Sequence, residues 1–196
     1  MSDEPTAWFE PLYVAATEGR AEIPWDRGGE PHALLVDWAQ RRRALVIGTG
    51  LGDDAEYMAS LGFRTLAFDV APTAVELARE RHPGSPVDYV VANLLDPPPE
   101  WRERFDLVFE SLTVQSMPPA VHAQAIESVA GFVAPGGTLL VIATQAQAPG
   151  QDGPPWPLTR AEIDAFATGG LRSVRVEEIP AAGQEGIVRW RAEFRR

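Results

Sequence analysis

The sequence Ala44-Leu45-Val46-Ile47-Gly48-Thr49-Gly50-Leu51-Gly52 joins an apolar run to three closely spaced glycines. The apolar run predicts a buried strand over 44–47, and a helix is predicted over 53–60. Glycine is required where the backbone takes a positive φ or where a ligand approaches it closely. Asp69 ends the next apolar run about 20 residues further on, where a carboxylate suits the hydroxyl groups of a ribose. The pattern therefore predicts binding of a cofactor that contains a nucleoside.

Strands and helices alternate through the rest of the chain. Further strands are predicted over 65–68, 87–91, 105–109, 138–143, 174–179 and 187–194, with Pro135-Gly136-Gly137 as a turn before the fifth strand. Thr159 is predicted to cap a helix, with Glu162 at the capping-box position. This order predicts an α/β fold: a single-domain, Rossmann-like, doubly wound sheet of about seven strands, mostly parallel with an antiparallel last strand, and helices on both faces. Residues 1–31 are predicted to form an N-terminal lid or leader packed on a domain formed by residues 32–196.

Composition narrows the classes of partner. The chain has 196 residues, a net charge of −11 and no cysteine. The acidic balance argues against a nucleic-acid partner, which requires a surface rich in Lys and Arg. The lack of cysteine excludes thiolate metal sites, and His32, His82 and His122 do not form a metal-ligand pattern with carboxylates. With no long apolar run and no signal-peptide pattern, we expect a cytoplasmic protein, monomeric or homodimeric, that binds a small molecule but no metal and no membrane.

The motifs resemble, in order and spacing, those of class I S-adenosylmethionine-dependent methyltransferases. The segments that carry the resemblance are 46–52, 68–78, 105–110 and 133–140, within a similar region of about 32–194. Residues 23–31 (IPWDRGGEP) and 153–158 (GPPWPL) resemble the thiopurine S-methyltransferase-like branch, which includes thiol and halide methyltransferases. The resemblance implies S-adenosyl-L-methionine as cofactor and methyl transfer to a small-molecule acceptor, a thiol or similar soft nucleophile, by in-line displacement. In that branch the first of these two segments lies over the cofactor and the second helps to line the substrate pocket.

The residues and the resemblance together define a candidate site. The predicted cofactor-binding residues are Trp25, Gly48, Gly50, Gly52, Asp69, Val70, Asn93, Leu94 and Glu110. The predicted substrate-pocket residues are Trp8, Asp26, Gln115 and Trp156, and Glu110 and Gln115 are also candidate catalytic residues with positioning roles.

Several of these residues have a second interpretation. A carboxylate at Glu110 is favourable beside a cationic sulfonium, but it could equally cap the segment that follows. Asp69 either binds ribose or caps the next helix. Trp25 is either a lid over the cofactor or a core anchor. Asn93 stands where the family usually has an acidic residue, and its side-chain carbonyl can accept from the adenine amine. The carboxylate that many members carry at the end of the first strand is missing, so a backbone carbonyl near Gly48 or Asp53 is expected to help hold the cofactor's ammonium group.

Three other functions remain open from the sequence. The acceptor could be an O or N atom of a small metabolite. A nicotinamide-dependent reductase uses a similar sheet, but its fingerprint would place a third glycine at position 53, where this chain has Asp53. A non-catalytic module that binds the cofactor is the third alternative.

Overall fold

The computed structural model describes residues 9–24, 28, 34, 42–147 and 153–196. The predicted site residues Trp8, Trp25 and Asp26 lie outside these described residues. By its internal contacts the chain divides into two compact units, Met1–Trp38 and Ala39–Arg196. The predicted leader over 1–31 falls within the first unit, and every site residue that the structure describes falls within the second.

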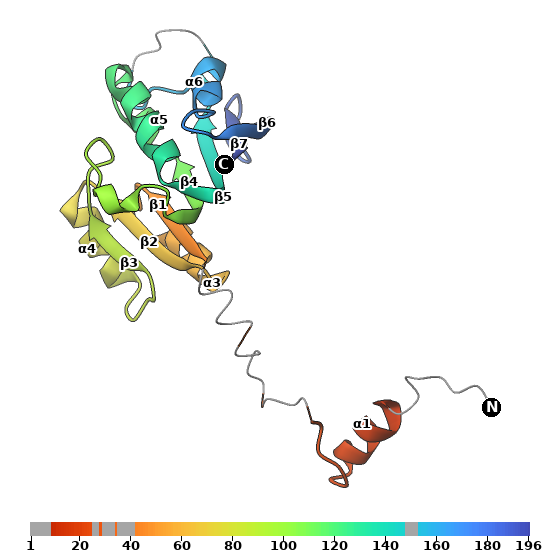
Figure 1. Cartoon of the computed structure of the whole chain (residues 1–196). Coiled ribbons are helices and arrows are strands. Elements are labelled where there is room, and N and C mark those ends of the chain that lie inside the picture. The colour runs from red at the N-terminus through yellow and green to blue at the C-terminus, as the bar shows by residue number, and fades with distance from the viewer. Residues whose placement is uncertain (1–8, 25–27, 29–33, 35–41, 148–152) are drawn as a thin grey trace. The chain divides into compact units, whose positions relative to one another are not determined.

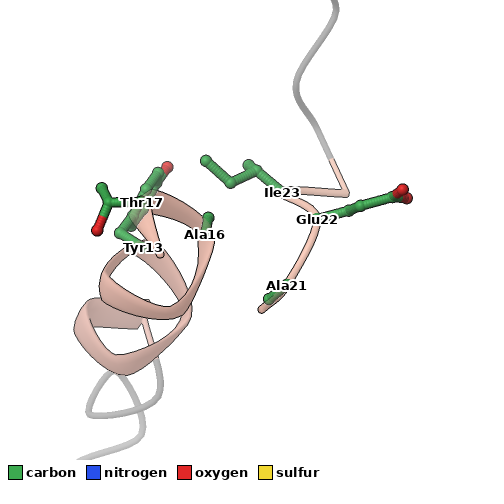
Figure 2. Close-up of a pocket in the computed structure, with 6 residues that line it drawn as sticks. All are labelled: Tyr13, Ala16, Thr17, Ala21, Glu22 and Ile23. Atoms are coloured by element: carbon green, nitrogen blue, oxygen red, sulfur yellow. The ribbon is translucent and has the colours of Figure 1, made fainter. Parts of the chain in front are cut away.

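The described part of the first unit includes the helix α1 (Phe9–Thr17), followed by Gly19 at a φ of 68°. A glycine with positive φ is a common end to a helix. Figure 2 shows the side chains that line a pocket beside α1: three come from the helix, and three from the segment after it. These residues are Tyr13, Ala16, Thr17, Ala21, Glu22 and Ile23.

The second unit is built on a seven-stranded sheet with the order β3-β2-β1-β4-β5-β7-β6 (Figure 1). Neighbouring strands from β3 to β5 pair in parallel, whereas β7 runs antiparallel to both β5 and β6. The predicted sheet, mostly parallel with an antiparallel last strand, is therefore confirmed. The strands are β1 (Arg43–Ile47), β2 (Arg64–Asp69), β3 (Asp88–Val91), β4 (Phe105–Ser111), β5 (Val133–Thr144), β6 (Arg172–Pro180) and β7 (Val188–Arg195).

Helices cover both faces of this sheet, as predicted (Figure 1). On one face α3 (Asp53–Ser60) and α4 (Pro72–Arg81) bury Ala55 and Val75 against Ala44 and Val46 of β1. The intervening residues of β1, Leu45 and Ile47, pack on the opposite face with residues of α5 (His122–Gly131) and α6 (Arg160–Ala165). Short 3-10 helices η1 (Pro99–Trp101), η2 (Val114–Ser116) and η3 (Pro119–Val121) lie in the connections. Within the described ranges, no helix combines the length and hydropathy needed to cross a bilayer.

The segment Pro135-Gly136-Gly137 lies inside β5, which begins at Val133, and not before the strand as predicted. Phe105 pairs with Val133 and Leu107 with Thr138, so two steps along β4 correspond to five along β5. Gly136 has a φ of 77°, and a Cβ on Gly137 would lie 2.9 Å from the carbonyl oxygen of Phe105. Pro135 and the two glycines thus form an irregularity within a strand, which resembles a turn in sequence because both need the same permissive backbone.

The glycine turn after β1 yields a stability prediction. Gly50 and Gly52 both have positive φ, so alanine costs about 1–2 kcal/mol at either position. A Cβ on Gly50 meets nothing within 4 Å, whereas one on Gly52 lies 2.5 Å from the hydroxyl of buried Tyr89. We therefore expect Gly52→Ala to lower the free energy of unfolding by about 1–3 kcal/mol more than Gly50→Ala, measured by urea denaturation without ligand. Equal losses would contradict the packing role assigned to Gly52.

Candidate active site

The carboxylate of Asp69 holds the glycine turn in place. Its Oδ2 accepts the N–H of Gly50 at 3.1 Å, and its Oδ1 accepts the N–H of Ala71 at 3.0 Å. The turn is also tied to β2 by a 2.9 Å hydrogen bond from the N–H of Thr49 to the carbonyl of Phe68. A carboxylate offers about four acceptor sites, so Asp69 retains capacity for further donors. These contacts order the glycine turn and the entry to α4, while ribose binding by Asp69 stays a prediction.

A crevice of about 530 Å³ lies beyond the carboxyl ends of β1 to β4, and we call it the Asp69 crevice. The strand order reverses between β1 and β4, which is where parallel sheets of this type bind ligands. The predicted residues that line it are Gly48, Asp69, Val70, Asn93 and Leu94. The sequence did not single out the lining residues Phe68, Ala92, Leu95, Ser111, Leu112, Thr113, Ser116 and Met117, although the last five follow directly from the end of β4.

The three glycines of the turn have different neighbours. Gly48 lines the crevice, and a Cβ there would lie 2.2 Å from Oγ1 of Thr113, which donates to the carbonyl of Ile47 at 3.0 Å. Gly50 faces open space, and Gly52 packs on Tyr89. Neither Gly50 nor Gly52 lines the Asp69 crevice. Packing therefore accounts for glycine at 48 and 52, whereas at position 50 the positive φ is what favours glycine.

The walls of the crevice are apolar with a few polar groups. Val70 is 66% exposed beside the opening, and Leu94 is buried. Oδ1 of Asn93 accepts the N–H of Leu95 at 3.0 Å, which fixes the orientation of the amide and leaves its NH₂ group directed elsewhere. One lone pair of that oxygen remains for a further donor.

Glu110 is fully buried and does not line the Asp69 crevice. Its Oε1 accepts the N–H groups of Thr113 and Val114 at 2.8 and 2.9 Å, so the carboxyl caps η2, the second of the two roles considered for it. Its Oε2 has no partner among the described residues. Burial raises the pKa of Glu110 to about 7, although the two backbone hydrogen bonds act in the opposite direction. Glu110 thus supports the crevice wall at Thr113 without lining the crevice itself.

Gln115 is also buried, and it joins three segments. Its Oε1 accepts the N–H of Thr144 at 2.5 Å, its Nε2 donates to Oγ1 of Thr144 at 3.1 Å, and its backbone carbonyl accepts the N–H of Trp156 at 2.6 Å. These bonds fix η2 to the end of β5 and to the loop that contains Gly153. The indole of Trp156 packs on Gly153, where a Cβ would lie 2.5 Å from its Cδ2.

A second cavity of about 750 Å³ lies at the carboxyl end of β5, and we call it the Gln115 pocket. Leu112 and Ser116 line both this pocket and the Asp69 crevice, so the two cavities adjoin. Pro154, Pro155 and Pro157 line the pocket, whereas Trp156 does not. The remaining lining residues are Gln115, Thr144, Gln145, Gln147, Gln184, Ile187, Val188 and Arg189.

The Asp69 crevice fits the adenosyl part of a nucleoside cofactor. It offers a carboxylate with free acceptor capacity for ribose hydroxyls and apolar walls for a flat base. Thr49 lies within the turn, and its buried Oγ1 has no partner among the described residues. Gly50 leaves open space beside the turn. These groups would hold the ribose and base, with the turn facing the rest of the cofactor.

The buried carboxyl of Glu110 yields a prediction on pH dependence. Glu110→Gln keeps an acceptor oxygen for the two N–H groups and removes the titration. Since folding raises the pKa from 4.5 to about 7, this group's contribution to stability is complete below pH 4.5 and is lost as pH rises through 7. We expect the wild-type free energy of unfolding to fall relative to the variant by up to about 3 kcal/mol between about pH 5 and 8, measured in urea. A difference that is constant with pH would contradict the assigned burial.

Comparisons with known proteins agree with this geometry. A family model described as "Methyltransferase domain" matches residues 45–141. Thiocyanate methyltransferase 1 of Brassica oleracea is 28% identical over 180 residues, which cover 86% of this chain and 79% of that protein. Probable thiol methyltransferase 2 of Arabidopsis thaliana is 25% identical, with 97% of this chain and 87% of that protein covered.

A solved structure shares the fold. N-methyltransferase NodS from Bradyrhizobium japonicum WM9, in complex with S-adenosylhomocysteine, superposes with a TM-score of 0.67 at 18% identity, covering 94% of this chain and 97% of that one. The matched residues 45–141 include every residue that lines the Asp69 crevice, which lies where open parallel sheets bind ligands. The chain is a class I S-adenosylmethionine-dependent methyltransferase, and its cofactor is S-adenosyl-L-methionine.

Proposed function

We propose that this methyltransferase acts on a small thiol or a similarly soft nucleophile bound in the Gln115 pocket. The observation that carries the proposal is the junction of the two cavities at Leu112 and Ser116, which supports an acceptor site next to the proposed cofactor site. The thiocyanate and thiol methyltransferases among the relatives support a sulfur acceptor.

We assign roles within this site from the described contacts. Asp69 binds the ribose hydroxyls, Val70 and Leu94 contact the adenine, and Asn93 accepts from its amine. Glu110 and Gln115 are positioning residues, because their hydrogen bonds hold η2 between the two cavities. The leader residues Trp8, Trp25 and Asp26, together with Trp156, remain proposed parts of a cover that excludes water.

The chemistry of a thiolate acceptor suits the lining of the Gln115 pocket. When bound, the cofactor supplies a methyl group on a sulfonium, already activated for transfer. The thiolate lone pair would form the new C–S bond as the bond from the methyl carbon to the sulfonium sulfur breaks. The positive sulfonium and the negative thiolate would thereby both become neutral thioethers. No Asp, Glu or His lines the Gln115 pocket within the described ranges, so it offers no evident base for a neutral alcohol or ammonium group. An acceptor that ionises in water needs only alignment in a dry site.

Asp69→Ala tests the cofactor site. Loss of the carboxylate removes the acceptors for both ribose hydroxyls, and charge-assisted hydrogen bonds contribute about 1.5–3 kcal/mol each. We expect the affinity for S-adenosylhomocysteine to fall at least about tenfold by calorimetric titration. Asp106→Ala is the matched control, because Asp106 also accepts a backbone N–H, that of Arg43 at 2.8 Å, at the other end of the strands. Equal affinity losses in the two variants would remove Asp69 from the cofactor site.

An acceptor panel tests the reaction. With labelled S-adenosylmethionine we expect methyl transfer to 2-mercaptoethanol or thiophenol, at a rate that rises with pH as the thiol ionises. Phenol and ethanolamine of similar size should react at least about tenfold more slowly. Thiocyanate and iodide complete the panel. A preference for phenol or the amine would overturn the thiol proposal and leave the methyltransferase assignment intact.

A further inference from the structure

We propose that Arg189 binds an anionic group of the acceptor, so that the preferred substrate is an organic thiol carrying a separate carboxylate or similar acid. This inference rests on the proposed function, because it assigns the Gln115 pocket to the acceptor. Arg189 lies near the start of β7, and its side chain lines that pocket.

The guanidinium of Arg189 has unused donors. It donates through one terminal nitrogen to Oγ1 of Thr144 and through the other to Oε1 of Gln184 at 3.0 Å. A guanidinium carries five N–H donors, so these two bonds leave three for a ligand. A planar fork of this kind matches a carboxylate.

Arg189 also has no carboxylate partner among the described residues, in a chain with a net charge of −11. Arg191, two residues further along the same strand, pairs with Glu177 at 2.8 Å. A half-buried cation without a counter-ion costs free energy, and a bound anion removes that cost. The charge of Arg189 is therefore available to an anionic group of a molecule that binds in the pocket.

Hydrogen bonds connect Arg189 to the side of the pocket that adjoins the Asp69 crevice. Oγ1 of Thr144 receives hydrogen bonds from both Nε2 of Gln115 and Arg189, so the guanidinium is connected to η2 through two side chains. Leu112, at the junction of the two cavities, has a φ of 60°, a conformation that non-glycine residues adopt at a cost. An acceptor bound at Arg189 would extend its other end toward this junction.

The size and lining of the pocket favour an organic acid over a bare inorganic anion. At about 750 Å³ the pocket is many times larger than a water molecule's share of about 30 Å³, so a halide would leave most of it filled with water. Gln115, Gln145, Gln147 and Gln184 line the same pocket, and their side-chain amides suit a polar molecule with several oxygen or nitrogen atoms.

The test compares two thiols that differ in charge, 3-mercaptopropionate and 3-mercaptopropionamide, with the holoenzyme and labelled cofactor. We expect the carboxylate thiol to be preferred in kcat/KM by at least about tenfold. Arg189→Met should lower kcat/KM for the carboxylate thiol by about tenfold or more and for the amide by less than about twofold, chiefly through KM. Arg189→Lys should restore part of the preference. Arg191→Met is the matched control on the same strand and should change neither value.

A binding measurement separates this inference from the proposed function. Calorimetric titration of 3-(methylthio)propionate into the complex with S-adenosylhomocysteine should show affinity that Arg189→Met weakens at least about tenfold, while the affinity for S-adenosylhomocysteine stays unchanged. Lack of turnover with any thiol would overturn the thiol acceptor, but anion binding that depends on Arg189 would still support this inference. Equal binding or turnover of the charged and uncharged compounds, or equal losses for both in Arg189→Met, would overturn it.

Discussion

The central strand β1 imposes the constraint on which the site depends. It pairs on one side with β2 and on the other with β4, and four of its five residues are buried. Because β1 has a neighbouring strand on each side, the chain cannot continue sideways within the sheet where β1 ends. It therefore turns tightly over the end of the sheet. Glycine at 48, 50 and 52 makes the positive φ values of that turn accessible. The same reversal leaves the space that becomes the Asp69 crevice.

Polar groups behind the cavities keep this arrangement in place. Glu110 accepts two backbone N–H groups in the loop after β4, and Gln115 accepts one at the end of β5. Hydrogen bonds stabilise buried polar side chains, and those that Glu110 and Gln115 make also fix the walls of the cavities. The lining itself can then remain free for ligands. This arrangement explains why amides and a guanidinium line the Gln115 pocket, while the hydrogen bonds of Glu110 and Gln115 support its walls.

The two cavities differ in the kind of ligand that their surfaces suit. The Asp69 crevice combines one carboxylate with apolar walls, as a ribose and a flat base require. The Gln115 pocket has a cation and four amides, and no acidic side chain among its described lining residues. The cationic sulfonium is thus expected beside the carboxylate of the Asp69 crevice, and the anionic acceptor beside the cation of the Gln115 pocket. Transfer of the methyl group cancels the positive charge of the sulfonium and the negative charge of the reacting atom. The contrast between the cavities therefore agrees with methyl transfer to an anion.

The sequence by itself determined the fold class, the helix over Asp53–Ser60 and the place of Asp69, because hydrophobic periodicity, glycine spacing and capping are local properties of the chain. It could not separate a turn at Pro135-Gly136-Gly137 from an irregularity within β5, since that distinction depends on pairing with Phe105. It could not choose between the two roles of Glu110, which only the position of the N–H groups of Thr113 and Val114 decides. It gave no sign of Arg189, because a basic residue in a strand looks the same whether or not a carboxylate lies opposite. Burial, pairing partners and the meeting of distant loops are set by tertiary structure, and they decide which polar residues support the walls and which face the ligand.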